Sequence, residues 1–270
     1  MQPGRVKPSR LTPRFLEKVW GSTRLQPWFP NSDRKIGEVW FHTEDIPLLV
    51  KFLFTTDKLS VQVHPGDEYA RIHHNSAGKT EMWHVLAAEP GARIAAGFRE
   101  PLDETRLKTA ALSGEIEGLL EWVEARPGDT FFIPAGTVHA IGGGLSLLEI
   151  QQHSDVTYRL YDYGRPRELH LDHAAATSHR RPHVALQKPS GETLVSCDYF
   201  HTSRITINGS QSYRPGGSSE LLVFIEGSGE LNRESTQAGD VWHVPAGAQA
   251  CEVQGNVTVL VTRAKKPAQP

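Results

Sequence analysis

The stretch Leu59-Ser60-Val61-Gln62-Val63-His64-Pro65 alternates apolar and polar side chains up to its proline. A period of two is typical of a β-strand, in which successive side chains point to opposite faces. Gln62 and His64 therefore share one face of the strand, and Val61 and Val63 share the other. Because amide oxygens and imidazole nitrogens can coordinate metal ions, we expect this strand to present two donors to a common interior.

Two further potential ligands stand at the ends of other predicted strands. Glu81 begins a predicted strand at residues 81–86, and His139 follows an apolar run at residues 130–133 and a Pro-x-Gly turn. Donors from separate strands can surround one divalent cation and leave a coordination position for water. The sequence thus offers a mixed nitrogen and oxygen set: Gln62, His64, Glu81 and His139.

The evidence for this metal site lies in the combination of motifs. A Gln-x-His pair on a strand is more often an ordinary polar surface pair than a metal site. The motif Gly-Asp-x₄-Pro-x-Gly-x₂-His over residues 128–139 is sharper, and the other donors lie upstream of it. Metal binding is therefore the favoured interpretation, with a polar surface pair as the alternative.

The rest of the chain is typical of a mainly β protein. Its 270 residues include 24 Gly and 18 Pro, and short apolar runs alternate with turn residues, as in a β-sandwich or barrel. Residues 36–41 and 48–54 are predicted strands, and the second, apolar except for Lys51, is expected to be buried on both faces. Residues 102–125 carry apolar side chains at three- and four-residue steps, which predicts a small helical insertion broken near Gly114.

An internal echo predicts a second barrel. Residues 127–136 and 238–247 share Gly-Asp, four residues, then Pro-Ala-Gly. In this register His139 falls opposite Ala250, so the second copy is expected to lack a metal. The predicted division is a flexible arm (1–10), a metal-binding domain with the helical insertion (11–189), a second, metal-free β domain (190–264) and a tail (265–270).

Composition argues against several classes of partner. The formal charge of −2, from 29 Lys and Arg against 31 Asp and Glu, gives no basic field for nucleic acid. No apolar run approaches membrane-spanning length, and the basic start lacks the apolar core of a signal peptide. Two cysteines, Cys197 and Cys251, are too few for a disulfide framework. We expect a cytoplasmic, monomeric protein with a small-molecule ligand and neither nucleic-acid nor membrane partners.

Five motifs follow one another along the chain: Gln62-Val63-His64-Pro65, Gly78-Lys79-Thr80-Glu81, Pro134-Ala135-Gly136-Thr137-Val138-His139-Ala140-Ile141, Leu148-Glu149-Ile150-Gln151-Gln152 and Ser154-Asp155-Val156-Thr157-Tyr158-Arg159. Together they resemble the type I mannose-6-phosphate isomerases in their short bacterial form. The resemblance extends from Trp20-Gly21 through Arg167-Glu168-Leu169-His170 and is weak after Leu194. It implies a cupin fold of jelly-roll barrels, here two in tandem, one Zn²⁺ per chain, and interconversion of mannose 6-phosphate and fructose 6-phosphate.

The resemblance also implies a role for each matched residue. The four donors named above match the zinc ligands, and Arg159 matches the active-site arginine. Lys79 matches a pocket lysine, and Glu149 and Asp155 fall on polar pocket positions. Without the resemblance, Lys79 is better interpreted as a solvated loop lysine. The alternative for Arg159 is a structural ion pair with Asp155 or Glu149.

The implied reaction gives these residues separate tasks. Moving a carbonyl between C1 and C2 requires removal of a proton beside it and stabilisation of an enediolate, whose charge collects on oxygen. Zinc can polarise the substrate oxygens. Lys79 and Glu149 are both candidates for the proton shuttle, and the sequence does not choose between them. Arg159 offers a planar cation for the phosphate or the enediolate, and Lys79 and Asp155 are expected to contact the substrate.

Two other function classes fit the same motifs. A non-catalytic sugar-phosphate-binding or regulatory cupin would be stabilised by its ligand without forming product. A metal-dependent oxygenase on this fold would prefer iron and consume oxygen. The presence of Lys79, Glu149, Asp155 and Arg159 around one predicted site favours the isomerase.

Overall fold

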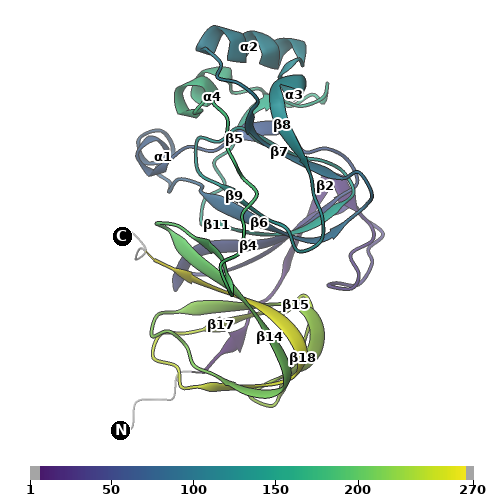
Figure 1. The fold of residues 1–270 in the computed structure, drawn as a ribbon, viewed down its shortest axis with the longest axis vertical. Coiled ribbons are helices and arrows are strands. Elements are labelled where there is room, and N and C mark those ends of the chain that lie inside the picture. The colour runs from purple at the N-terminus through teal and green to yellow at the C-terminus, as the bar shows by residue number, and fades with distance from the viewer. Residues whose placement is uncertain (1–6, 266–270) are drawn as a thin grey trace.

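The computed structural model describes residues 7–265 and arranges most of them in three antiparallel sheets (Figure 1). The central sheet has the order β2 (Arg14–Ser22), β3 (Ile36–Thr43), β4 (Ile46–Thr55), β11 (Leu145–Gln152), β6 (Glu81–Ala88) and β9 (Thr130–Ile133). The small sheet has the order β12 (Tyr158–Tyr161), β5 (Val61–Val63), β10 (His139–Ile141), β7 (Arg93–Phe98) and β8 (Leu120–Glu124). The C-terminal sheet has the order β1 (Ser9–Arg10), β17 (Val241–Val244), β15 (Glu220–Leu231), β18 (Cys251–Ala264), β14 (Phe200–Tyr213) and β13 (Thr193–Ser196), with β16 (Glu234–Gln237) paired to β15.

Four helices complete the described part: α1 (Asp67–His74), α2 (Glu104–Ser113), α3 (Ile116–Leu119) and α4 (Leu171–Thr177). In Figure 1, α2, α3 and α4 lie beyond the small sheet, at the end of the molecule farthest from the C-terminal sheet. Within residues 7–265, no helix is long and apolar enough to cross a membrane.

The central sheet is buried on both faces. On one face Trp83 and Leu147 share a core with Ile94 and Ile141 of the small sheet, which closes the first barrel. On the other face, the side chains Val50, Phe52, Leu148 and Ile150 share a core with Leu221, Val223 and Leu260 of the C-terminal sheet. Each fully buried aliphatic or aromatic side chain contributes about 1.5–3 kcal/mol. The prediction that residues 48–54 form a strand buried on both sides is confirmed.

The helical insertion is present but shorter than predicted. Helix α2 begins after Asp103, whose carboxylate accepts the Arg106 N–H at 2.7 Å, and ends at Gly114 with φ +81°. A short helix, α3, follows. Residues 120–124 were expected to be helical and instead form β8, which pairs with the otherwise open edge of β7. Sheet pairing satisfies the backbone groups of that edge and outweighs the weak helical periodicity of these residues.

The internal echo is a structural repeat. Strands β9 and β17 each follow a turn with a glycine at positive φ, +90° at Gly128 and +98° at Gly239. In each turn the following aspartate accepts a backbone N–H: Asp129 from Arg126 at 2.9 Å, and Asp240 from Gln237 at 3.0 Å. The mainly β, tandem cupin-type architecture expected from the sequence is thus observed, whereas a metal-free second barrel stays a prediction.

One boundary prediction needs correction. The flexible arm was expected to extend to residue 10, but Ser9–Arg10 form β1 and pair with His243 and Trp242 of β17. Residues 1–6, and all of the predicted tail except Lys265, lie outside the described residues. The segment 170–189 contains α4, whose Ala174 and Ala175 form a buried helical face.

Candidate active site

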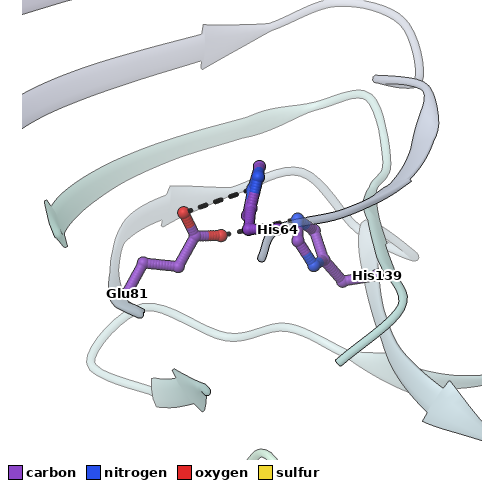
Figure 2. A group of neighbouring side chains, drawn as sticks. All are labelled: His64, Glu81 and His139. Carbon is purple, nitrogen blue, oxygen red and sulfur yellow. Dashed lines mark ion pairs between the residues drawn. The ribbon is translucent and has the colours of Figure 1, made fainter. Parts of the chain in front are cut away.

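Three of the four predicted metal ligands converge inside the first barrel. His64 follows β5, Glu81 begins β6 and His139 begins β10, and their potential ligand atoms all lie within 4.8 Å of one another. The three side chains are at most 1 % exposed. Figure 2 shows the two imidazole rings and the carboxylate directed toward one another. The alternation along residues 59–64 therefore predicted the correct face of the strand.

Backbone carbonyls orient both imidazole rings. His64 Nδ1 lies 2.9 Å from the Val156 carbonyl oxygen, and His139 Nδ1 lies 2.9 Å from the Thr137 carbonyl oxygen. A carbonyl only accepts hydrogen bonds, so each Nδ1 carries the hydrogen and each Nε2 keeps its lone pair. Those Nε2 atoms lie 3.6 Å and 3.4 Å from the two oxygens of Glu81.

The electrostatics of this cluster fit a divalent cation. Burial lowers the pKa of His64 well below its usual value and that of His139 to about 4, so both rings are neutral, as metal ligands must be. Burial also raises the pKa of Glu81 to about 7, although Lys79 opposes the shift. Glu81 Oε1 is buried and accepts no hydrogen bond from the described residues. A cation at this point would satisfy that oxygen and favour the carboxylate form.

Gln62 lies beside the cluster with its amide nitrogen inward. Its Oε1 accepts a hydrogen bond from Ser60 Oγ at 3.1 Å, while its Nε2 lies 3.3 Å from His139 Nε2. A half-turn of the amide group exchanges the oxygen and nitrogen positions. It gives up the contact between Gln62 Nε2 and His139 Nε2, while Ser60 Oγ, which can donate or accept, can accept from the rotated nitrogen. Gln62 can therefore supply a fourth donor through that rotation.

Lys79 joins this cluster to a second carboxylate. Its ammonium forms an ion pair with Glu81 Oε2 and lies 2.9 Å from His64 Nε2 and 3.9 Å from Glu149 Oε1. Lys79 is 4 % exposed, so the interpretation of a solvated loop lysine is wrong. Lys79 and Glu149, both predicted to be catalytic, thus lie next to the predicted ligands.

Lys51 is a site residue that the sequence analysis did not assign. It lies opposite Glu149 on the paired strands β4 and β11, and its Nζ is 3.1 Å from Glu149 Oε1. Trp83 Nε1 donates to Glu149 Oε2 at 2.9 Å. Burial opposes ionisation of Glu149, but Lys51 and then Lys79 outweigh it and hold its pKa at about 2. A single lysine in an otherwise apolar predicted strand was the signal for this site.

Arg159 and Asp155 are more exposed than the residues of the buried cluster. Arg159 pairs directly with Gln62, which pairs on its other side with His139, so the three side chains project from one face of the small sheet. Within the described residues Arg159 forms no ion pair with Asp155 or Glu149, and its Nη1 donates to the Glu168 carbonyl oxygen instead. Asp155 is exposed. Burial acts to lower the pKa of the Lys51 ammonium, but nearby carboxylates, Asp155 among them, raise that pKa above its usual value.

The fold and the site together define a cupin-type β-barrel protein with a buried His, Glu, His metal-binding cluster. No family model matches the sequence. The mannose-6-phosphate isomerase ManA of Bacillus subtilis (strain 168) is 32% identical, over 95% of this chain and 99% of that protein. The chain belongs to the mannose-6-phosphate isomerase family, as the resemblance implied.

Solved structures agree with this assignment. The crystal structure of the mannose 6-phosphate isomerase from Bacillus subtilis superposes with a TM-score of 0.86 at 31% identity, over 95% of this chain and 99% of that one. A zinc-bound mannose 6-phosphate isomerase shares the fold, with a TM-score of 0.76 at 16% identity over 96% of this chain and 100% of that one.

Proposed function

We propose that the protein is a zinc-dependent aldose-ketose isomerase that interconverts mannose 6-phosphate and fructose 6-phosphate through an enediolate. The observation that carries the proposal is the buried cluster of His64, Glu81 and His139, directly beside Lys79. One carboxylate oxygen of this cluster accepts no hydrogen bond from residues 7–265. These residues and Gln62 would hold one Zn²⁺ per chain. When bound there, zinc supplies a Lewis acid that polarises substrate oxygens.

Lys79 is the better candidate for the proton shuttle. A carboxylate with a pKa of about 2 is a weak base near neutral pH, and Glu149 is held in that state by its two lysines and Trp83. Lys79 Nζ lies at the cluster itself, 2.9 Å from His64 Nε2. We therefore assign proton transfer to Lys79, and assign Glu149 the task of orienting Lys79 and Lys51 by charge.

Arg159 and Asp155 are proposed to bind the substrate. The guanidinium of Arg159 projects from the face that carries Gln62 and His139, so it can meet the phosphate or the enediolate oxygens. Asp155 is exposed near Lys51 and can accept from a sugar hydroxyl. With a small sugar phosphate as the only partner, we propose a cytoplasmic monomer without nucleic-acid or membrane partners.

Metal-dependent turnover tests the proposal. Purified protein should convert mannose 6-phosphate in a coupled assay, lose activity on chelation, regain it with Zn²⁺, and bind one ion per chain by calorimetry. Glu81→Gln should lose both zinc affinity and turnover, whereas His201→Asn, in the C-terminal sheet and remote from the cluster, should change neither. Ligand-induced stabilisation without product would instead support a binding protein, and full activity in metal-free protein would refute the zinc site.

Two matched variants separate the proton carriers. Lys79→Met should abolish turnover, while Glu149→Gln, which removes the charge and keeps the shape, should only reduce it. Zinc stoichiometry near one in both variants would show that the metal cluster survives. Abolished turnover in Glu149→Gln, with residual turnover in Lys79→Met, would move the base to Glu149.

A further inference from the structure

Strand β12 is the edge of the small sheet, and Arg159 lies in it. In an antiparallel pair the backbone N–H and C=O of a residue point together, either toward the partner strand or away from it. At Arg159 both groups point away from β5, because both form hydrogen bonds with His170. The Arg159 N–H donates to His170 Nδ1 at 3.1 Å, and the His170 N–H donates to the Arg159 carbonyl at 2.8 Å. His170 thus closes the open edge at this residue.

The same segment holds the guanidinium. Arg159 Nη1 donates to the Glu168 carbonyl oxygen at 2.8 Å. Arg159 Nε is buried and donates to no acceptor among the described residues. The segment 168–170 therefore fixes Arg159 at its N–H, its C=O and one guanidinium nitrogen, and leaves Nε as a buried donor.

Within residues 7–265, the His170 side chain makes one hydrogen bond, the one to the Arg159 N–H. His170 is the N-cap residue of α4, but its side chain makes no capping hydrogen bond, and only its carbonyl accepts from Ala174 N–H at 2.9 Å. An unpaired N–H on an edge strand would be free to exchange with solvent and to let the strand twist. At Arg159, His170 Nδ1 supplies the hydrogen-bond acceptor that a neighbouring strand would otherwise supply.

We propose that His170 is a positioning residue that holds Arg159 in the orientation required to meet the substrate. The inference rests on the proposed function, because it takes Arg159 as the group that binds the substrate's phosphate or enediolate. It adds a requirement that the isomerase function alone does not contain: the ring must present an unprotonated Nδ1 to the Arg159 N–H. His170 acts through Arg159 and is not itself a catalytic residue.

The surroundings of the ring keep it neutral. His170 Nδ1 accepts, so the ring hydrogen is on Nε2, and protonation of Nδ1 would break the bond. Burial is the main cause that lowers the pKa of His170, followed by Arg159, with Glu168 opposing. The groups that face the ring from the neighbouring elements are His173 of α4, His74 of α1 and Tyr158 of β12. Protonation of the His170 ring in acid should therefore break its hydrogen bond with the Arg159 N–H.

Two amides that differ by one methylene group test the role. In His170→Asn the Oδ1 atom takes the place of Nδ1 and remains an acceptor that does not titrate, whereas in His170→Gln the acceptor lies one carbon too far. We expect His170→Gln to lower kcat/KM roughly tenfold, the effect of one lost hydrogen bond. His170→Asn should stay near wild type and lose the part of the acid limb of kcat/KM that His170 causes. His201→Asn is the control for a remote histidine.

A second measurement does not depend on turnover. Hydrogen exchange of the Arg159 amide, followed by NMR at one pH, should be slow in wild type and His170→Asn and faster in His170→Gln. Equal exchange and equal kcat/KM in all three proteins would overturn the proposal. If no variant isomerises mannose 6-phosphate, wild type included, the proposed function fails, and faster exchange in His170→Gln alone would still show that His170 holds Arg159.

Discussion

Lys51 is buried between an acid and an aromatic ring. Its Nζ lies 3.1 Å from Glu149 Oε1 and 4.7 Å from the centre of the Trp40 ring, and the residue is 3 % exposed. We expect Lys51→Met to lower the free energy of unfolding by about 3 kcal/mol, because breaking a buried pair leaves an uncompensated charge. Turnover should also fall, since Lys79 becomes the only ammonium that pairs with Glu149. Chemical denaturation and the coupled assay measure the two effects.

A double variant provides the control for Lys51→Met. Lys51→Met with Glu149→Leu removes both charges, and an apolar pair of similar volume should recover part of the lost stability without recovering turnover. The recovery is partial because Trp83 Nε1 then lacks its acceptor. Wild-type stability of Lys51→Met alone would contradict a buried ion pair at this position.

Individual donors were predictable where a local rule applied. Alternation placed Gln62 and His64 on one face, and the turn motif identified His139, because both rules concern the chain within a few residues. The environment of Lys51 was not predictable, since it depends on Glu149 and Trp40, which reach it from other strands. Sequence spacing also carries no information on an amide rotation such as that of Gln62.

The turn between β9 and β10 positions His139. Gly136 has φ +85°, and a Cβ on it would lie 2.7 Å from the His179 ring. We expect Gly136→Ala to lower the free energy of unfolding by about 1–3 kcal/mol through backbone strain and this contact, and to weaken zinc binding because His139 moves. Thermal unfolding and calorimetry with Zn²⁺ measure these changes.

The structural repeat offers a matched control for Gly136. Gly247 occupies the same turn position in the second copy, with φ +75° and no atom within 4 Å of a Cβ. Gly247→Ala should therefore cost only the backbone strain, and leave zinc affinity unchanged. A similar loss of zinc affinity in both variants would show that the turn does not act on His139.

Elements with a strong local pattern were predicted, and elements defined by their partners were not. Strands β3 and β4 and helix α2 follow clear local patterns or capping residues. Strand β8 and the two-residue β1 exist because they pair with β7 and β17, and neither pairing is visible in the local sequence. Helix α4 is short and depends on its packing near β12.

The contact between the central and C-terminal sheets contains a buried histidine. His84 is 2 % exposed, hydrogen-bonds Thr130 Oγ1 at 2.9 Å, and has its pKa lowered to about 4 by burial and by Arg204 of β14. The fold favours the neutral ring, so stability is full above the unfolded pKa of 6.5 and falls as pH drops toward 4. We expect His84 to account for about 3 kcal/mol of this loss.

The substitution His84→Asn isolates the contribution of His84 to the pH dependence of stability. In His84→Asn the Oδ1 atom can keep the hydrogen bond to Thr130, and no group titrates. The difference in unfolding free energy between wild type and variant, measured from pH 7 to pH 4, should shrink in magnitude or reverse as the pH falls. Contributions from His64 and His139 cancel in this difference, because these residues titrate equally in wild type and variant. A pH-independent difference would contradict a buried neutral His84.

The two halves of the molecule share one core. Phe52 and Leu148 of the central sheet pack with Leu221 and Leu260 of the C-terminal sheet, and Trp28 Nε1 donates to the Ile225 carbonyl oxygen at 2.8 Å. We therefore expect one cooperative unfolding transition for the whole chain, and aggregation of a chain that ends at residue 189. Calorimetry and size-exclusion chromatography test this. Two separate transitions would support the independent domains 11–189 and 190–264 predicted from the sequence.

In β4, Lys51 lies between Val50 and Phe52, so neighbouring residues of one strand face the proposed active site and the core between the two halves. Insertion or deletion of a single residue in β4 would turn each side chain to the opposite face of the sheet. A charge would then lie in the core between the two halves, and an apolar side chain would lie beside Glu149. Substitutions on either face can be tolerated separately, but the length of this strand is constrained by both. Among related chains, length variation should accordingly fall in the loops, and β4 should keep its residue count.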